Sequence, residues 1–336
     1  MTRSAHPDEA LFRGEKPFPV LPVCEHYAGS QKTIARAFEL QDEMGAVFDV
    51  TCDCEDGAPM GEERSHAEMI VQMLRSPANR LRMAGVRVHG YDHPSWRQDV
   101  DILLRGAGER VAYLTLPKAT CAAEARDMID YIRGVAQQAG IARELPIHVL
   151  IETHGALRDA WEIAALPWVQ TLDFGLLDFI SAHHGAIPSH AMRSPGQFEH
   201  HLLIRAKTEI VAAALANGIV PSHNISLEMR NPHNTYQDAW RARNEFGFMR
   251  MYSIHPDQIK PIVDAMKPSS AEIHRACEIL LLAQKESWGP IQLHGDMYDR
   301  ASYRYYWDLL RKAKACAVAI PAAAEAAFFQ GVEGAR

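Results

Sequence analysis

The feature that most constrains the fold of this chain is an alternation of short apolar runs with helical segments, repeated eight times between residues 21 and 254. The apolar runs occupy residues 21–25, 46–52, 85–89, 111–116, 146–151, 169–174, 218–221 and 248–254. Several consist mainly of Val, Leu and Ile without polar alternation, which is typical of strands buried on both faces of a parallel sheet. Eight strand–helix units in about 240 residues predict an α/β protein with a (β/α)8 TIM barrel.

A doubly wound sheet is the alternative fold for such an alternation. It would require a glycine-rich phosphate-binding turn after an early strand. The sequence contains neither a G-x-G-x-x-G motif nor a Walker loop, so the barrel is the preferred prediction.

The chain divides into three predicted parts. Residues 1–19 are polar, carry three prolines and predict an extended N-terminal arm. Residues 20–267 contain the alternation and predict the catalytic barrel. The alternation then stops, and residues 268–336 predict a C-terminal helical extension, with helices at 271–286 and 300–318 and a turn-rich lid segment at 288–299 between them.

Composition restricts the partners and the compartment of this chain. Its formal charge of −7 gives no reason to expect nucleic acid or an anionic membrane as a partner. There is no apolar run long enough for a membrane span and no signal-peptide core, so we expect a cytoplasmic protein. The six cysteines are dispersed, and reduced thiols are the default in that compartment. Cys52 and Cys54 lack a second close pair, which argues against a zinc cluster.

Polar and charged side chains follow most of the predicted strands. In a barrel, the carboxyl ends of the strands meet at one rim, where the active sites of such enzymes lie. Carboxylates that converge there with an arginine and a lysine suit metal-assisted chemistry on an anionic substrate. The predicted rim residues are Glu25, His26, Asp53, Glu55, Asp56, Arg87, His89, Lys118, Glu152, Asp178, His223 and His255.

Glu152 and Asp178 are the predicted metal ligands. Each follows a buried apolar run, and two such acids on successive strands can converge on one hard cation with oxygen ligands. The alternative for either residue alone is a cap of the following helix. Arg87 ends a buried strand, where an unpaired charge is costly, and therefore requires an anion. That anion is a substrate carboxylate, Glu55 or Asp56, since arginine binds carboxylates in bidentate geometry.

The crowded acids Asp53, Glu55 and Asp56 are expected to hold Arg87 or metal-bound water rather than to bind the metal directly. Lys118 fits a charge-balancing role near these acids, and a Schiff-base lysine is the alternative. The adjacent pairs His183-His184 and His200-His201 point apart on any regular element, so surface histidines are expected there.

These motifs together resemble those of the HpcH/HpaI aldolase and citrate lyase β-subunit family. The resemblance covers roughly residues 47–299, and six pieces occur in the family's order and at its intervals. They are Asp53-Cys54-Glu55-Asp56-Gly57-Ala58, Val86-Arg87-Val88-His89, Leu116-Pro117-Lys118, Ile151-Glu152-Thr153, Phe174-Gly175-x-x-Asp178 and Ser253-Ile254-His255-Pro256-x-Gln258.

The resemblance implies a β/α barrel with a C-terminal helical extension, assembled as a homotrimer or hexamer. It implies Mg²⁺, with Mn²⁺ as an alternative, bound by Glu152 and Asp178, and Arg87 on the carboxylate or carbonyl of a 2-oxo acid unit. Residues 295–299 look like the family's lid motif, which implies that Asp299 acts as an acid or base, also on a neighbouring subunit's site. Three departures concern the substrate: residues 22–26 lack the usual Arg-Ser pair, His89 replaces Asn, and the loop at 183–195 differs.

The resulting hypothesis is a Mg²⁺-dependent carbon–carbon lyase of the citrate lyase β-like class. It would cleave a malyl-, citramalyl- or citryl-CoA type of ester into a 2-oxo acid and an acyl-CoA. The catalytic residues would be Arg87, Asp299, Glu55 and Asp56, and the substrate-binding residues Arg87, Glu152 and Lys118. The alternatives are a metal-dependent aldolase for free 2-oxo acids without coenzyme A, and a lyase subunit that depends on a carrier protein.

Overall fold

The computed structural model describes residues 5–12, 14–15 and 18–330, and these form two compact units. One unit is Pro22–Met266, and the other combines the described residues up to Leu21 with those from Lys267 onward. None of the described helices has the length and apolar character needed to cross a membrane.

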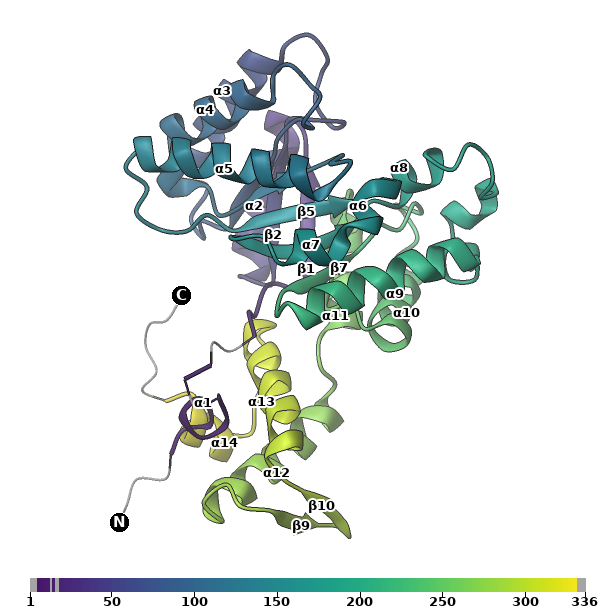
Figure 1. Cartoon of the computed structure of the whole chain (residues 1–336). Helices are drawn as coiled ribbons and strands as arrows, with labels where there is room; N and C mark the ends of the chain where they lie inside the picture. The colour runs from purple at the N-terminus through teal and green to yellow at the C-terminus, as the bar shows by residue number, and fades with distance from the viewer. Residues whose placement is uncertain (1–4, 13, 16–17, 331–336) are drawn as a thin grey trace. The chain divides into compact units, whose positions relative to one another are not determined.

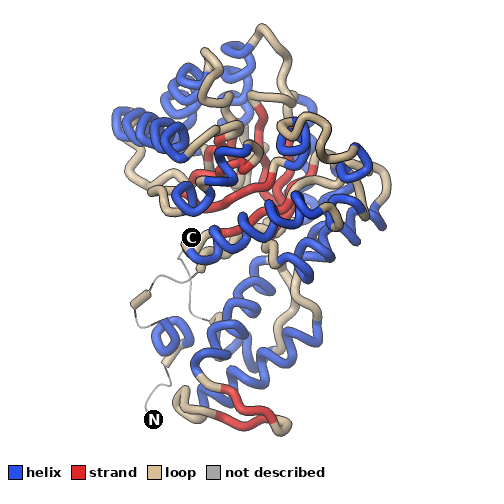
Figure 2. Tube along the Cα trace, turned by 45° about the vertical axis from the view of Figure 1, so that its right-hand side comes forward, coloured by secondary structure: helices blue, strands red, loops and turns tan. Residues whose placement is uncertain are grey.

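The unit Pro22–Met266 is a closed barrel of eight parallel strands paired in sequence order, β1 to β8. This confirms the predicted (β/α)8 fold, and Figure 2 shows helices surrounding the strands. The strands are β1 Cys24–Ala28, β2 Phe48–Asp53, β3 Ala84–Arg87, β4 Leu114–Leu116, β5 Ile147–Ile151, β6 Val169–Phe174, β7 Val220–His223 and β8 Arg250–Ser253.

The helices of this unit, labelled in Figure 1 where there is room, follow the strands along the chain. They are α2 Gln31–Met44, α3 Glu63–Arg75, α4 Trp96–Ala107, α5 Ala122–Gln138, α6 His154–Arg158, α7 Ala160–Ala164, α8 Leu176–Ser181, α9 His201–Ala216, α10 Pro232–Arg241 and α11 Pro256–Met266. Short 3₁₀ turns lie at Gly108–Arg110, Ser189–Met192 and Gly196–Phe198, and a π-turn at Ala242–Phe246 extends α10.

Local sequence signals account for the ends of helix α2. The Ser30 hydroxyl accepts the Thr33 N–H while Thr33 in turn accepts the Ser30 N–H, a reciprocal capping box. Gly45 ends the helix at a φ of 82°, a conformation that favours glycine. The buried face of Ile34, Ala37 and Phe38 packs this helix onto the barrel.

The inside of the barrel is unusually polar. Bulky branched side chains commonly fill such interiors. Here ion pairs and hydrogen bonds link strands that are not neighbours: Thr51 of β2 bonds Tyr113, which directly precedes β4, and Arg250 of β8 pairs with Asp49 of β2. Because these contacts cross the barrel, the side chains must point inward, and all of them are buried.

The second unit has its own core, built from α12 Ser270–Lys285, α13 Arg300–Ala315, α14 Ala322–Phe328 and α1 Pro7–Phe12. The prediction of an extended arm is wrong for Pro7–Phe12, because Leu11 and Phe12 bury themselves in this core as part of a helix. The rest of the arm at residues 1–4, 13 and 16–17 lies outside the described residues.

The predicted lid segment contains a hairpin of β9 Ile291–Leu293 and β10 Asp296–Tyr298. Its two turn residues, His294 and Gly295, have φ values of 52° and 92°. Positive φ at both positions is the geometry of tight two-residue hairpin turns.

Candidate active site

Arg87 is the centre of a buried charge cluster at the carboxyl end of the barrel. Its Nε and Nη2 atoms donate to Oδ1 and Oδ2 of Asp53 at 2.8 and 2.6 Å, and Nη1 lies 3.0 Å from Oε2 of Glu55. Asp53 also accepts the backbone N–H groups of Glu55 and Gly57 at 3.0 and 2.8 Å. Burial raises the pKa of Asp53, but Arg87 and these donors outweigh it and lower that pKa below its usual value.

Lys118 joins this cluster from the loop after β4. Its Nζ pairs with Glu55 and lies 2.9 Å from Oδ1 of Asp56 and 3.9 Å from Oδ1 of Asp178. Burial lowers the pKa of the Lys118 ammonium, but Glu55 and Asp56 outweigh burial and raise it. A lysine held in its charged form suits charge balance and not Schiff-base chemistry, which requires the neutral amine.

The backbone of Lys118 has a second role. Its φ of 54° places it in the left-handed region, which is uncommon outside glycine. In this conformation its N–H donates to Oε1 of Glu152 at 2.7 Å. The loop after β4 therefore orients the first predicted metal ligand, and such local strain is found most often at functional sites.

Glu152 and Asp178 fit the requirements of a hard divalent cation. Glu152 is buried at the end of β5, and Asp178 is 42% exposed in the first turn of α8. Burial, followed by the charge of Asp178, raises the pKa of Glu152 to about 8. Two oxygen donors that repel one another, with one open to solvent, suit Mg²⁺ and its water ligands. The alternative capping role does not apply to Glu152, because the Thr153 hydroxyl caps α6.

A cavity of about 520 Å³ opens over these groups. Charged side chains from five barrel segments reach it, while its remaining wall is largely aromatic and aliphatic. Its polar and charged lining includes Lys32, Thr33, Arg36, Asp53, Asp56, Arg87, Glu152 and Asp178. A pocket of this size with a few convergent charges is typical of a small-molecule site.

Several predicted rim residues lie elsewhere. Glu25 is buried inside the barrel, because β1 spans Cys24–Ala28 instead of ending at Glu25 as predicted. His223 is buried against α9, where its Nε2 lies 2.8 Å from Nζ of Lys207. His89 bonds Asp99 at 2.6 Å, and His255 lies beside Asp257.

Asp299 belongs to the second unit, where it caps α13. Its Oδ1 accepts the backbone N–H groups of Ala301 and Ser302 at 3.0 and 3.4 Å. The neighbouring hairpin residue Met297 is 74% exposed. The catalytic role predicted for Asp299 remains a prediction.

Sequence reasoning missed Tyr27 and Tyr252, which line the cavity beside Arg87. The Arg87 guanidinium lies 5.2 Å from the centre of the Tyr27 ring, and the rings of Tyr27 and Tyr252 are 5.3 Å apart. The three-residue error in the first strand concealed Tyr27. With β1 at Cys24–Ala28, alternation places Glu25 and Tyr27 on the inward face.

Comparison with known proteins identifies the family. The sequence pattern of the HpcH/HpaI aldolase/citrate lyase family matches residues 35–256. An L-malyl-CoA/β-methylmalyl-CoA lyase of Rhodobacter capsulatus is 25% identical over 317 residues, which cover 90% of this chain and 98% of that protein. Citrate lyase subunit beta of Escherichia coli K12 is 25% identical over 254 residues, covering 74% of this chain and 79% of that protein.

Solved structures agree with the sequence match. A citrate lyase from Burkholderia xenovorans LB400 is 51% identical, with a TM-score of 0.85 over 96% of this chain and all of that chain. The CitE protein of Mycobacterium tuberculosis, solved with magnesium, acetoacetate and coenzyme A, shares the fold at 22% identity, with a TM-score of 0.66 over 88% of this chain and 98% of its own. The predicted resemblance is confirmed, and the chain belongs to the HpcH/HpaI aldolase/citrate lyase family.

Proposed function

We propose that the protein is a Mg²⁺-dependent lyase that cleaves a malyl-, citramalyl- or citryl-CoA type of ester into a 2-oxo acid and an acyl-CoA. The class, a carbon–carbon lyase, follows from the family. One observation carries the assignment to this site: the acids Glu152 and Asp178 line the same cavity as Arg87.

The division of roles follows from what each side chain contacts. Glu152 and Asp178 would hold Mg²⁺, which when bound polarises substrate oxygens as a Lewis acid. Arg87, fixed by Asp53 and Glu55, would stabilise the charge that develops on the oxygen of the departing 2-oxo acid. A guanidinium held rigidly before the reaction needs little reorganisation during it.

Glu55 and Asp56 would have different roles in the proposed reaction. Asp56 lines the cavity, which supports a role as the base that takes the proton of the substrate hydroxyl as the carbon–carbon bond breaks. Glu55 does not line the cavity, and it contacts Arg87 and Lys118. Its role would be to position those two cations, with Lys118 balancing the charge of Asp56 and Asp178.

The bond cleavage leaves an acyl-CoA enolate that must be protonated. We propose Asp299, on the segment after the exposed hairpin, as the donor, from the same chain or from a neighbour in a homotrimer or hexamer. Coenzyme A is favoured over a free acid because Lys32 and Arg36 of α2 line the cavity and offer cations to a phosphate-bearing substrate. None of the six cysteines, all of which lie within the described residues, forms a disulfide, in keeping with the cytoplasmic location that we propose.

The test is a cleavage assay on pure protein with hydroxyacyl-CoA esters and free hydroxy-oxo acids, each with Mg²⁺ or with EDTA. Products are identified by mass spectrometry, and Glu152→Gln is the matched variant. Cleavage of an ester by the wild type only, abolished by EDTA, supports the proposal. Cleavage of free acids alone identifies the aldolase without coenzyme A, and activity that requires an added acyl carrier protein identifies the carrier-dependent subunit. An equally active Glu152→Gln variant would overturn the metal assignment.

A further inference from the structure

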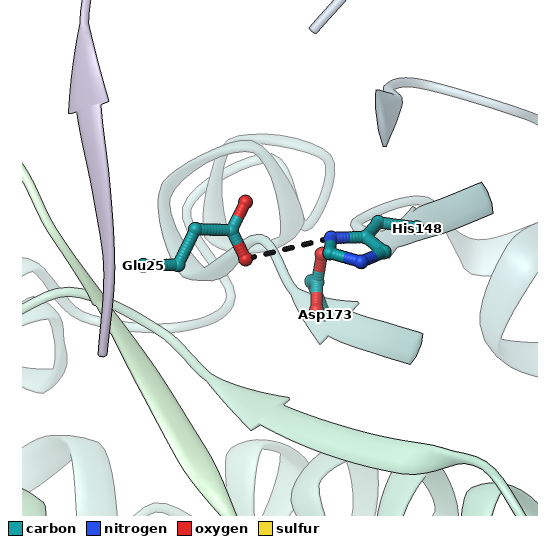
Figure 3. A group of neighbouring side chains, drawn as sticks. All are labelled: Glu25, His148 and Asp173. Atoms are coloured by element: carbon teal, nitrogen blue, oxygen red, sulfur yellow. Dashed lines mark ion pairs between the residues drawn. The ribbon is translucent and has the colours of Figure 1, made fainter. Parts of the chain in front are cut away.

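A second group of possible ligands lies inside the barrel, apart from the proposed magnesium site. Glu25 of β1, His148 of β5 and Asp173 of β6 converge there, and Figure 3 shows the three side chains pointing toward one another. One potential ligand atom from each lies within 4.8 Å of the other two, and Oε2 of Glu25 is 3.6 Å from Nδ1 of His148. All three residues have no exposed surface.

The atoms that face this space have no hydrogen-bond partner among the described residues. They are both carboxylate oxygens of Asp173, Nδ1 of His148 and Oε2 of Glu25, the last of which is ion-paired with Nη2 of Arg250 at 3.2 Å. A buried polar atom without a partner is costly, and a buried carboxylate without one is more costly still. An ordinary folded core contains few such atoms, so four around one space require an explanation.

The remaining contacts of these residues hold them in this arrangement. Oε1 of Glu25 accepts the Thr51 hydroxyl at 2.5 Å, which leaves Oε2 toward the shared space. His148 stacks on Tyr113 with ring centres 4.0 Å apart, and its Nε2 lies 3.3 Å from Oε1 of Gln170. The other ring nitrogen, Nδ1, therefore faces Glu25.

Asp173 has hydroxyl neighbours that do not satisfy it. Thr171 and Ser222 act to lower the Asp173 pKa, but neither makes a hydrogen bond of good geometry, and both hydroxyls are themselves without a partner among the described residues. Burial, followed by the charge of Glu25, outweighs them and raises the Asp173 pKa well above its usual value. A carboxylate buried without hydrogen-bond donors is strongly destabilised unless a proton or a cation joins it.

The charges of the surrounding interior leave an excess of acid. Among the residues that the structure describes, Arg250 is the cation that pairs with acids in this cluster: its Nη2 lies 2.6 Å from Asp49 and 3.2 Å from Glu25. If Glu25, Asp49 and Asp173 were all ionised, one guanidinium would leave two negative charges in a buried space. Nε2 of His148 faces the Oε1 acceptor of Gln170, so in the neutral imidazole it carries the ring proton and Nδ1 keeps a lone pair that can bind a metal.

We propose that Glu25, His148 and Asp173 bind a divalent metal ion inside the barrel. One imidazole and two carboxylates match Zn²⁺ or Mn²⁺ better than Mg²⁺, which prefers oxygen ligands alone. Two positive charges would neutralise the excess, and the ion would join β1, β5 and β6 beneath the cavity. Because the ligands are fully buried, the ion enters as the chain folds, and its role is to stabilise the barrel. The inference does not depend on the proposed lyase activity.

The experiment measures bound metal after the ion is offered during folding. Wild type, Asp173→Asn and the control Glu152→Gln are refolded with Zn²⁺ or Mn²⁺, dialysed against EDTA and analysed by inductively coupled plasma mass spectrometry. Wild type and Glu152→Gln should retain about one ion per chain, because a buried site exchanges only on unfolding, and Asp173→Asn should retain none. Loss of the ion should also lower the melting temperature of the wild type.

Equal metal content in wild type and Asp173→Asn would overturn the proposal, as would a wild type that retains no ion. In that case a protonated Asp173 accounts for its missing partners. If Asp173→Asn does not fold, the wild type alone decides: refolded with Co²⁺, it should show visible absorption bands of cobalt bound by nitrogen and oxygen that survive in Glu152→Gln. Absence of these bands refutes the site, whatever the outcome of the lyase assay.

Discussion

Replacement of Arg87 by methionine should reduce both stability and activity, for separable reasons. Methionine keeps an unbranched apolar stem but removes the three nitrogen contacts to Asp53 and Glu55. The side chain of Asp53 is only 4% exposed, so its carboxylate would remain buried without its countercharge. Breaking a buried pair by removing one partner costs about 3–5 kcal/mol.

For Arg87→Met, the structure favours a loss of unfolding free energy at the lower end of that range. Asp53 keeps two backbone donors, from Glu55 and Gly57, and Glu55 keeps Lys118. We therefore expect Arg87→Met to lower the free energy of unfolding by about 3 kcal/mol, measured by urea titration with circular dichroism. The catalytic rate should fall about 10²–10³-fold, as when a preorganised donor is removed from a transition state.

The double variant Asp53→Asn/Arg87→Met separates the two effects. It also removes the buried Asp53 carboxylate charge that would otherwise lack a countercharge, so most of the lost stability should return. The catalytic rate should stay as low as in Arg87→Met. If the double variant regained the rate, Arg87 would act only by supporting Asp53 and its placement on the substrate would be wrong. If Arg87→Met were as stable as the wild type, the argument from the buried charge would fail.

Three further outcomes are expected. Glu152→Gln should weaken the apparent Mg²⁺ affinity by more than about 100-fold in a titration of activity against Mg²⁺, because it removes a ligand and not only a supporting contact; unchanged affinity would exclude Glu152 as a ligand. Gly175→Ala should lower activity and Mg²⁺ affinity, because a Cβ atom at this position would lie 2.5 Å from Cβ of Glu152 and closer still to its carboxylate. The control is Gly134→Ala in α5, where an added Cβ meets nothing within 4 Å, and it should leave both activity and Mg²⁺ affinity unchanged. Burial lowers the pKa of His26 to about 4, so as the pH falls below 6.5 the unfolded chain takes up a proton at this residue before the folded chain does. His26 should therefore remove about 2 kcal/mol from the free energy of unfolding between about pH 7.5 and pH 5, and His26→Asn should lack this loss in urea unfolding. If His26→Asn showed the same pH dependence as the wild type, the lowered pKa of His26 would be contradicted.

The fold was predictable because the signals that set it are local. The apolar run at 169–174 became β6 with those same bounds, and the helices predicted at 271–286 and 300–318 became α12 and α13. Strand β1 was misplaced by three residues since its sequence, Cys24-Glu25-His26-Tyr27-Ala28, is largely polar. Apolar periodicity cannot find a strand whose inward face carries charges, because those charges are satisfied only by residues distant in sequence.

The same limit explains what sequence could and could not say about the site. Arg87 was expected to need an anion, since an unpaired charge at a strand end is costly, and the structure supplies Asp53 and Glu55 together. The backbone bond from Lys118 to Glu152 could not be anticipated, because it depends on a left-handed residue in a loop and on the register of β4 against β5. The rim forms only when the eight strands close into a barrel, so no single segment of the sequence determines its geometry.

The rim and the barrel interior share one electrostatic problem. At the rim, Arg87 and Lys118 are outnumbered by the acids around them, Asp53, Glu55, Asp56, Glu152 and Asp178. Burial raises the pKa of Glu152 to about 8. Excess acid under a low-dielectric wall must be neutralised by protons or by metal ions, and the two compete for the same oxygens. Magnesium binding at neutral pH should therefore displace a proton from Glu152, and the affinity should fall as the pH drops below the pKa of this carboxyl. The same burial that makes Glu152 costly to ionise in the empty site thus favours a cation in the site, because a cation stabilises the ionised carboxylate.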